Sequence, residues 1–391
     1  MGLPRTSARG ARDAAPRCPA HAGAGRLGRH RRPANRYLPP SDTGWLASHR
    51  PYVGQAVPPG LRPTEPVSGR RPREVLWRPP VTDLLRVVDP GLYTTVQDLG
   101  RPHAISSGVP PGGAMDRFAH SAANLLVGND IGAATLECTL IGPRLVAEAP
   151  CLVAVTGADC ELLINARPAP MWSGIFLSTG DELHFGARRS GARMHIAVSG
   201  GVAADRWLGS LSTNVIAGRG GMHGRPLMSG DVIAAVAERS GPGVSGRELD
   251  PHLRPDYSNH TLGVIAGPHM KRLDADGRAA LLGSTFHVSR DADRMGYRLD
   301  GATLRAAGDE LLSFGLVAGA LQVPGGGQPI LLMADHQTAG GYPVVAVVVS
   351  ASMAIAAQLV PGDEVRFEET TIEAALRVRR ERRAALDSLR S

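Results

Sequence analysis

Polar side chains gather in four short stretches of this 391-residue chain. They are residues 93–101 (YTTVQDLGR), 112–117 (GGAMDR), 291–299 (DADRMGYRL) and 321–343, where an apolar run leads into ADHQTAGGYP. Carboxylates of this kind orient or deprotonate nucleophiles, guanidinium groups bind carboxylate or phosphoryl oxygens, and side-chain amides match the polar edge of an amide substrate. The four stretches therefore carry the groups that acyl or phosphoryl chemistry needs.

The glycines Gly340 and Gly341 would let a ligand approach the backbone closely, because no Cβ intervenes. Spacing alone leaves a second interpretation open, since Asp, Gln and Arg at strand ends also cap turns and loops. His336 is a weaker candidate for a catalytic base, because a His at a strand edge is usually structural.

Several catalytic motifs are absent. Lys271 is the only lysine, and its surroundings (GPHMKR) lack the glycines and the Ser or Thr of a phosphate-binding loop. The nucleophile motif GxSxG and the zinc motif HExxH do not occur, and we predict no metal site.

The positive charge of the chain is concentrated in its first 80 residues. The whole chain carries +7, whereas residues 1–80 alone hold fifteen arginines against four acidic residues, so the remainder is mildly acidic. Phosphate binding along a nucleic acid needs a clustered positive surface, so we expect no nucleic-acid partner.

Residues 1–80 also contain 14 of the 31 prolines, and we predict a disordered extension there. A true start near Val81 and an organellar transit peptide are alternatives, although amphipathic spacing is missing.

From Leu84 onward the pattern predicts short strands and tight turns. The β-type runs are separated by turn signals (GAD, TGD, RSGA), and cover 152–156, 161–164, 175–177, 182–185 and 194–198. Helical spacing predicts a helix over 116–126, and 344–349 reads as a buried strand that runs into a short helix. The predicted domains are residues 84–237 and 261–370, joined by a polar connection and followed by a charged helix over 371–391.

The four cysteines have no CxxC spacing, which favours buried free thiols in a reducing cytoplasm. The most apolar run, 344–360, is interrupted by polar residues and is shorter than the ~20 residues of a membrane helix. We therefore expect a cytoplasmic chain with no membrane partner.

Long phrases of the sequence resemble one family, the C subunit of the bacterial ATP-dependent 5-oxoprolinase. This family is related to the antagonist of the sporulation kinase inhibitor and to the carboxyltransferase region of urea carboxylase. The resemblance covers roughly residues 84–370, and it rests on PGLYTTVQDLGRPH (90–103), GVPPGGAMDRFAHSAANLLVGN (108–129), LECTLIGP (136–143), DRMGYRLDG (293–301) and LQVPGGGQPILLMADHQTAGGYP (321–343). At the positions of His336 and Ala339 the family more often has Arg and Thr.

The resemblance implies a mainly β fold of two cyclophilin-like β-barrel domains with few helices. It also implies a complex with the two other 5-oxoprolinase components, the inhibitor-like B subunit and the A subunit. The implied reaction opens 5-oxo-L-proline to L-glutamate with hydrolysis of ATP, the co-substrate, to ADP and phosphate.

For that reaction the candidate catalytic residues are Asp98, Asp335 and Gln337. The candidate substrate-binding residues carry guanidinium, amide, carboxylate or hydroxyl groups in the same stretches: Gln97, Arg101, Asp116, Arg294, Arg298, Gln322, Thr338 and Tyr342. Without a phosphate-binding loop, the nucleotide is expected at a subunit junction.

Two other functions remain open at this point. A biotin-dependent carboxyltransferase acting on urea or an amide needs similar groups. Its biotin would arrive on another chain, since Lys271 is not in a Met-Lys-Met setting. A non-enzymatic antagonist of a kinase inhibitor is the third possibility.

Overall fold

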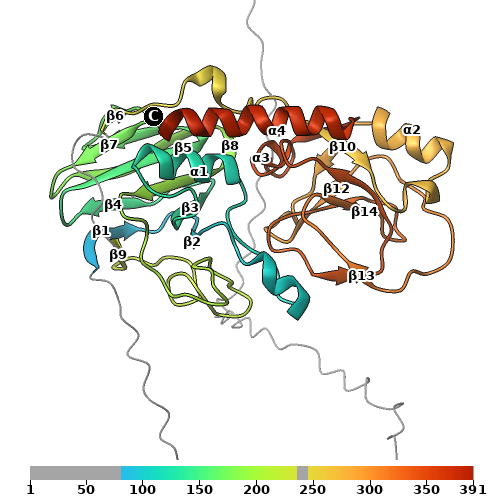
Figure 1. The fold of residues 1–391 in the computed structure, drawn as a ribbon, viewed down its shortest axis with the longest axis horizontal. Coiled ribbons are helices and arrows are strands. Elements are labelled where there is room, and N and C mark those ends of the chain that lie inside the picture. Colours follow the sequence, from blue (N-terminus) through green and yellow to red (C-terminus); the bar gives the residue numbers. More distant parts are fainter. Residues whose placement is uncertain (1–80, 236–244, 391) are drawn as a thin grey trace, which may run out of the picture. The chain divides into compact units, whose positions relative to one another are not determined.

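The computed structural model describes residues 81–235 and 245–390, all within one compact unit, Glu74–Ser391. The extension predicted over 1–80 lies outside the described residues. The predicted mainly β fold is confirmed, with a curled sheet in an N-terminal lobe (82–235) and a closed barrel in a C-terminal lobe (261–369) (Figure 1).

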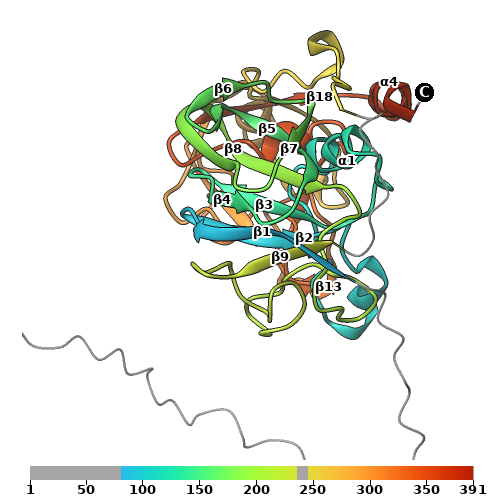
Figure 2. The ribbon, with the colours of Figure 1, turned by 90° about the vertical axis from the view of Figure 1, so that its left-hand side faces the viewer.

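The sheet of the N-terminal lobe has nine strands, and its main path runs in the order β2-β3-β8-β4-β1-β9. Strand β5 pairs with β8 and carries β6 and β7 (Figure 2). The strands are β1 (Thr82–Asp89), β2 (Tyr93–Gln97), β3 (Thr135–Thr139), β4 (Arg144–Ala147), β5 (Cys151–Ile164), β6 (Arg167–Ala169), β7 (Gly174–Leu177), β8 (Glu182–Val198) and β9 (Val232–Ala235).

Strands β5 and β8 correct the sequence prediction, which divided each of them into two short strands at a glycine. The predicted TGD turn is present between β7 and β8, but GAD and RSGA lie inside long strands. The register of the β5–β8 pair shifts between Gly157 and Asp159, so the extra residue is absorbed as a bulge rather than a turn. Gly157 has φ +101°, and a Cβ there would lie 2.2 Å from the Arg193 carbonyl oxygen, so only glycine fits.

Helix α1 (Arg117–Leu126) is buried against the curled sheet. Its N-cap is Asp116, whose side chain accepts the backbone N–H of Ala119 at 2.9 Å. Helix α4 (Ile372–Asp387) lies alongside α1 (Figures 1 and 2) and accounts for the charged helix expected at the end of the sequence.

The C-terminal lobe is a seven-stranded barrel in the order β10-β17-β14-β15-β12-β11-β18, closed by the parallel pair β18–β10. Its strands are β10 (Thr261–Ala266), β11 (Phe286–Val288), β12 (Gly296–Asp300), β14 (Ala320–Gln322), β15 (Ile330–Leu332), β17 (Val344–Val348) and β18 (Glu364–Glu369). A separate two-stranded sheet joins β13 (Phe314–Gly315) and β16 (Ala339–Gly340).

Short helical elements complete the described chain. They are η1 (Pro102–Ser107), η3 (Pro251–Leu253), η4 (Met270–Arg272), α2 (Ala275–Gly283), α3 (Met353–Ala356) and η5 (Ser388–Arg390). Strand β17 followed by α3 confirms the predicted strand that runs into a short helix. No helix in the described ranges is long and apolar enough to cross a membrane.

Candidate functional site

Arg294 lies where the two lobes meet and is 8% exposed. Its Nε donates to Asp335 Oδ2 at 2.8 Å, within its own lobe. Across the junction its Nη1 donates to Glu137 Oε1 of strand β3, and its Nη2 donates to the Gly113 carbonyl at 2.7 Å. Burial alone would lower the pKa of Arg294, but the charges of Asp335 and Glu137 raise it above its ordinary value. The guanidinium is therefore a permanent positive charge held by both lobes.

Two uncharged histidines, His195 and His120, are buried on the side of Glu137 where β8 and α1 lie. His195 lies opposite Glu137 on the neighbouring strand β8, with its Nε2 3.8 Å from Glu137 Oε2. The rings of His195 and His120 meet edge to face at 5.7 Å. Burial lowers the pKa of each to about 3, so both rings are uncharged near neutral pH. Neither histidine therefore adds charge to the ion pairs of Arg294, which involve only the carboxylates of Glu137 and Asp335.

A cavity of about 590 Å³ opens beside Arg294 and Asp335, and we call it the junction cavity. Its polar wall includes Tyr93 and Arg193 of the N-terminal lobe. Apolar side chains form much of the remainder, among them Val109, Trp207, Val215, Ile216 and Met295. Such a mixture of apolar walls with a few charged groups is typical of a small-molecule site.

Arg101 is fully buried and is not among the residues that line the junction cavity, but its guanidinium lies 4.9 Å from the ring centroid of Trp207, which does line it. Its Nη2 donates to the Ser212 carbonyl, while Nε and Nη1 have no hydrogen-bond partner among residues 81–235 and 245–390. Gly112 separates Arg101 from Asp335, because a Cβ at Gly112 would lie 2.9 Å from Arg101 Nη1 and 3.5 Å from Asp335 Oδ1. Unpartnered buried N–H groups are costly, and a ligand anion would satisfy them.

All the hydrogen-bond partners of the Asp98 carboxylate belong to its own N-terminal lobe. Its carboxylate accepts the hydroxyls of Ser210 and Ser212, both at 2.6 Å, and the backbone N–H groups of Leu211 and Gly100, both at 2.7 Å. Burial raises its pKa, but the four hydrogen bonds together outweigh burial and hold the pKa below its ordinary value. The carboxylate therefore anchors the segment whose Ser212 carbonyl holds Arg101.

Three of the candidate site residues, Gln337, Gln322 and Tyr342, are linked by a chain of hydrogen bonds in the C-terminal lobe. Gln337 Nε2 donates to Gln322 Oε1 at 3.2 Å, and Gln322 Nε2 donates to the Tyr342 carbonyl at 3.5 Å. Gln322 is buried, whereas Gln337 and the Tyr342 side chain are exposed. None of the three is among the residues that line the junction cavity.

Four other predicted residues lie away from the junction cavity or are enclosed. Arg298 is exposed on β12 and Thr338 is half-buried, and neither lines the junction cavity. Gln97 is buried and donates to Thr95 Oγ1 at 2.9 Å. Asp116 is enclosed as the cap of α1, where burial raises its pKa. The structure thus brings Arg294, Asp335 and Arg101 together and spreads the others.

His336, considered above as a weaker candidate base, is buried, and its Nδ1 lies 2.7 Å from the Gln337 carbonyl oxygen. Burial lowers its pKa. Among the residues that the structure describes, no group of three or more His, Cys, Asp or Glu is placed to hold a metal ion.

Sequence reasoning missed Glu137, Arg193 and His195. A usable signal existed for Glu137, which is a single carboxylate inside the buried strand TLECT and must be paired to be stable there. Arg193 carried no comparable signal, because arginines are frequent around it in β8.

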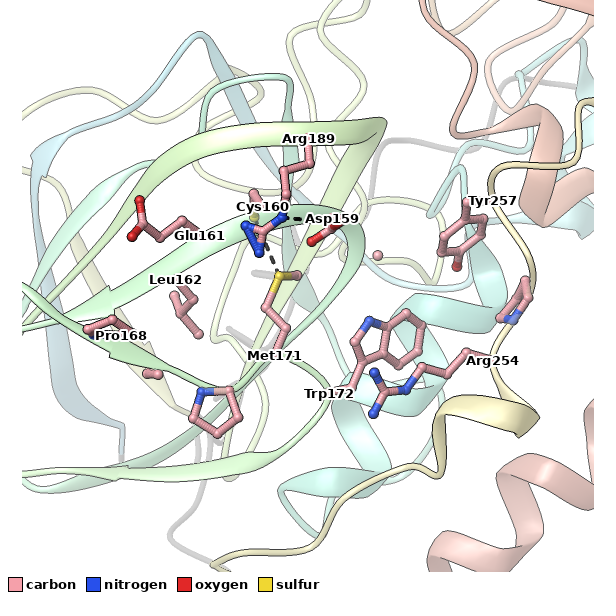
Figure 3. Close-up of a pocket in the computed structure, with 14 residues that line it drawn as sticks. Asp159, Cys160, Glu161, Leu162, Pro168, Met171, Trp172, Arg189, Arg254 and Tyr257 are labelled. Carbon is pink, nitrogen blue, oxygen red and sulfur yellow. Dashed lines mark hydrogen bonds and ion pairs between the residues drawn. The ribbon is translucent and has the colours of Figure 1, made fainter. Parts of the chain in front are cut away.

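A second cavity, of about 480 Å³, lies over strands β5 and β6 (Figure 3). Its arginines are already engaged. Arg189 pairs with Asp159 at 3.2 Å, and Arg254 stacks over Trp172 at 5.5 Å (Figure 3). Arg254 also pairs with Glu248 at 3.0 Å. The junction cavity, where guanidinium N–H groups lack partners, is the stronger candidate site.

Comparison with known proteins identifies relatives over most of this chain. The chain is 36% identical to the 5-oxoprolinase C subunit of Escherichia coli over 310 residues, which are 78% of this chain and 97% of that protein. It is 30% identical to urea amidolyase of Lachancea kluyveri over 325 residues, covering 78% of this chain but only 18% of that longer protein.

Solved structures give the same result. The crystal structure of Kluyveromyces lactis urea carboxylase matches 80% of this chain with a TM-score of 0.73 and 27% identity. This chain corresponds to 29% of that structure and to 20% of the K. lactis urea amidolyase structure, which matches with the same TM-score. The family described as carboxyltransferase domain, subdomain A and B, matches residues 107–369, a span that contains both the junction ion pairs and the barrel, and the chain belongs to this family.

Proposed function

We propose that this chain is the C subunit of an ATP-dependent 5-oxoprolinase, which opens 5-oxo-L-proline to L-glutamate in complex with the A and B subunits. The observation that carries the proposal is the junction cavity, where Arg294 and Asp335 lie beside the unpartnered N–H groups of Arg101. The identity of 36% to the E. coli protein over nearly its whole length supports the choice of reaction.

The chemistry suits these groups. The five-membered lactam is a stable amide, so ATP transfers its γ-phosphoryl group to the amide oxygen and leaves as ADP. Water then attacks the carbon, phosphate is released, and the C–N bond breaks to give glutamate. Asp335 is the group we assign to orienting or deprotonating the nucleophile, because its carboxylate borders the cavity and is half-buried. Arg294 and Arg101 stabilise negative charge that develops on the substrate.

The partner subunits supply what this chain lacks. Its single lysine, Lys271, lies in η4 outside the junction cavity, and the sequence has no phosphate-binding loop. We therefore assign the ATP site to a subunit junction, with this chain contributing arginines. The three described cysteines are free and buried, which suits a reducing cytoplasm.

The second candidate function is a biotin-dependent carboxyltransferase that acts on urea or another amide. The TM-score of 0.73 with urea carboxylase favours it. Carboxybiotin and 5-oxoproline both present a carboxylate, and the arginines that line the junction cavity suit either. In this case another chain carries the biotin.

Co-expression with the A and B subunits, followed by an assay for ATP-dependent glutamate production, separates the candidates. We expect activity in the complex and none in the single chain. Carboxyl transfer from carboxybiotin with no response to 5-oxoproline would support the carboxyltransferase. Binding to the inhibitor-like partner without either reaction would support a regulatory antagonist.

A further inference from the structure

Arg193 is a buried cation without a partner. It lies on β8, is 6% exposed and lines the junction cavity. Within the described ranges its guanidinium forms no hydrogen bond and no ion pair, and its Nε is wholly buried without an acceptor. By contrast, the nearby Arg294 is paired with two carboxylates. Because buried charges are normally paired, an unpaired one at a cavity wall indicates a missing anion.

The backbone of Arg193 is fixed from the other lobe. Gln358 Oε1 accepts the N–H groups of Ala192 and Arg193, both at 2.9 Å, and Gln358 Nε2 donates to the Arg193 carbonyl at 3.0 Å. Gly157 packs against the same carbonyl. The guanidinium is thus presented at the cavity from a rigid strand, which limits the entropy lost on binding.

The two carboxylates that pair with Arg294 form no ion pair with Arg193. Glu137 and Asp335 both hydrogen-bond to Arg294 instead, so the donors of the Arg193 guanidinium remain free for a ligand. Asp293 also lines the cavity, but it is exposed and accepts the N–H of Met295 at 2.7 Å. A triphosphate carries more negative charge than this wall balances, and the apolar lining suits a compact organic acid.

We propose that Arg193 binds the carboxylate of a small cyclic amide acid inside the junction cavity. This rests on the proposed function and assigns the group that selects 5-oxoproline over lactams without a carboxylate. Two donors on one guanidinium edge match a planar carboxylate.

Equilibrium binding in the complex with the A and B subunits tests the proposal. The ligands are 5-oxo-L-proline and 2-pyrrolidinone, which has the same ring without the carboxylate. Arg193→Gln should weaken 5-oxoproline binding about 30-fold or more and leave 2-pyrrolidinone binding unchanged. The matched control is Arg188→Gln, an exposed arginine on the same strand, which should change neither. Equal effects of Arg193→Gln on both ligands, or no effect, would overturn the proposal.

Thermal melting of ligand-free Arg193→Gln shows whether the substitution weakens binding only because it destabilises the fold. Removing an unpaired buried cation should leave the melting temperature of the ligand-free protein unchanged or raise it, and 5-oxoproline should stabilise only the wild type. A fall of several degrees in ligand-free Arg193→Gln would instead make Arg193 a structural residue.

Steady-state kinetics keeps this proposal separate from the proposed function. If the complex turns over 5-oxoproline and Arg193→Gln leaves KM unchanged, the carboxylate site is wrong and the function stands. If 5-oxoproline binds in an Arg193-dependent manner without turnover, the site stands and the function fails. A raised KM with kcat retained supports both.

Discussion

Arg294 of the C-terminal lobe donates a hydrogen bond to Glu137 of the N-terminal lobe, and both side chains are almost completely buried. This ion pair links loop 289–295, before β12, to β3 of the curled sheet. It therefore couples the stability of the lobes to the geometry of the junction cavity.

Glu137→Ala should lower the free energy of unfolding by about 3–5 kcal/mol, because it leaves a buried guanidinium without one of its two carboxylates. Glu148→Ala is the matched control, since Glu148 pairs with Arg86 at 2.5 Å but both side chains are at least 40% exposed. It should cost about 1 kcal/mol or less. Urea denaturation measures both losses. Equal losses would show that the buried Glu137–Arg294 pair stabilises the protein no more than the exposed Glu148–Arg86 pair does.

Asp335→Asn should reduce kcat by about 100-fold or more if the carboxylate handles a proton in the reaction. The change keeps the shape of the side chain, so the melting temperature should fall only slightly. Asp293→Asn, at the exposed edge of the same cavity, should retain activity. A parallel fall of stability and activity in Asp335→Asn would mean that Asp335 serves only to hold Arg294.

Gly112→Ala should reduce activity more than Gly108→Ala. Both glycines have positive φ, +63° and +75°, so both alanines carry a similar backbone cost of about 1 kcal/mol. Only at Gly112 would the new Cβ press on a site residue, because it would lie 2.9 Å from Arg101 Nη1 and in van der Waals contact with Asp335, whereas nothing lies within 4 Å of a Cβ at Gly108. Steady-state kinetics of the two variants separates displacement of the site from backbone strain.

The free energy of unfolding should fall as the pH drops from 6.5 toward 4.5. Burial lowers the pKa of His120 and His195 to about 3, so in this range the unfolded chain binds protons that the folded chain does not. Each histidine contributes a slope of up to about 1.4 kcal/mol per pH unit. His195→Gln should lower the slope by up to about 1.4 kcal/mol per pH unit, because the folded and unfolded chains then no longer differ in protonation at this position. Denaturation at several pH values gives the slopes.

Local pattern was sufficient for much of the fold. The apolar run 344–349 was predicted as a buried strand that runs into a short helix, and β17 followed by α3 has this arrangement. Local pattern was not sufficient at Gly157, where a glycine that reads as a turn is a bulge made by the partner strand.

For the candidate site too, local sequence pattern predicted some residues and missed others. Arg294 and Asp335 stand in conspicuous polar stretches, and sequence reasoning selected both. Their third partner, Glu137, is 157 residues away from Arg294 along the chain, and no local pattern connects the two. Arg193 was missed for a related reason, since what marks it is the absence of a partner in three dimensions.

The parallel pairing of β10 with β18 has a consequence for synthesis of the protein. Thr261 pairs with Arg366 and Val264 with Glu369, so the first and last strands of the barrel are neighbours. A ribosome must therefore release about a hundred residues after β10 before the barrel can close, and until β18 is made the edges of β10 and β11 that pair with it stay open. Nascent chains that stop before Glu364 should be the species that chaperones retain.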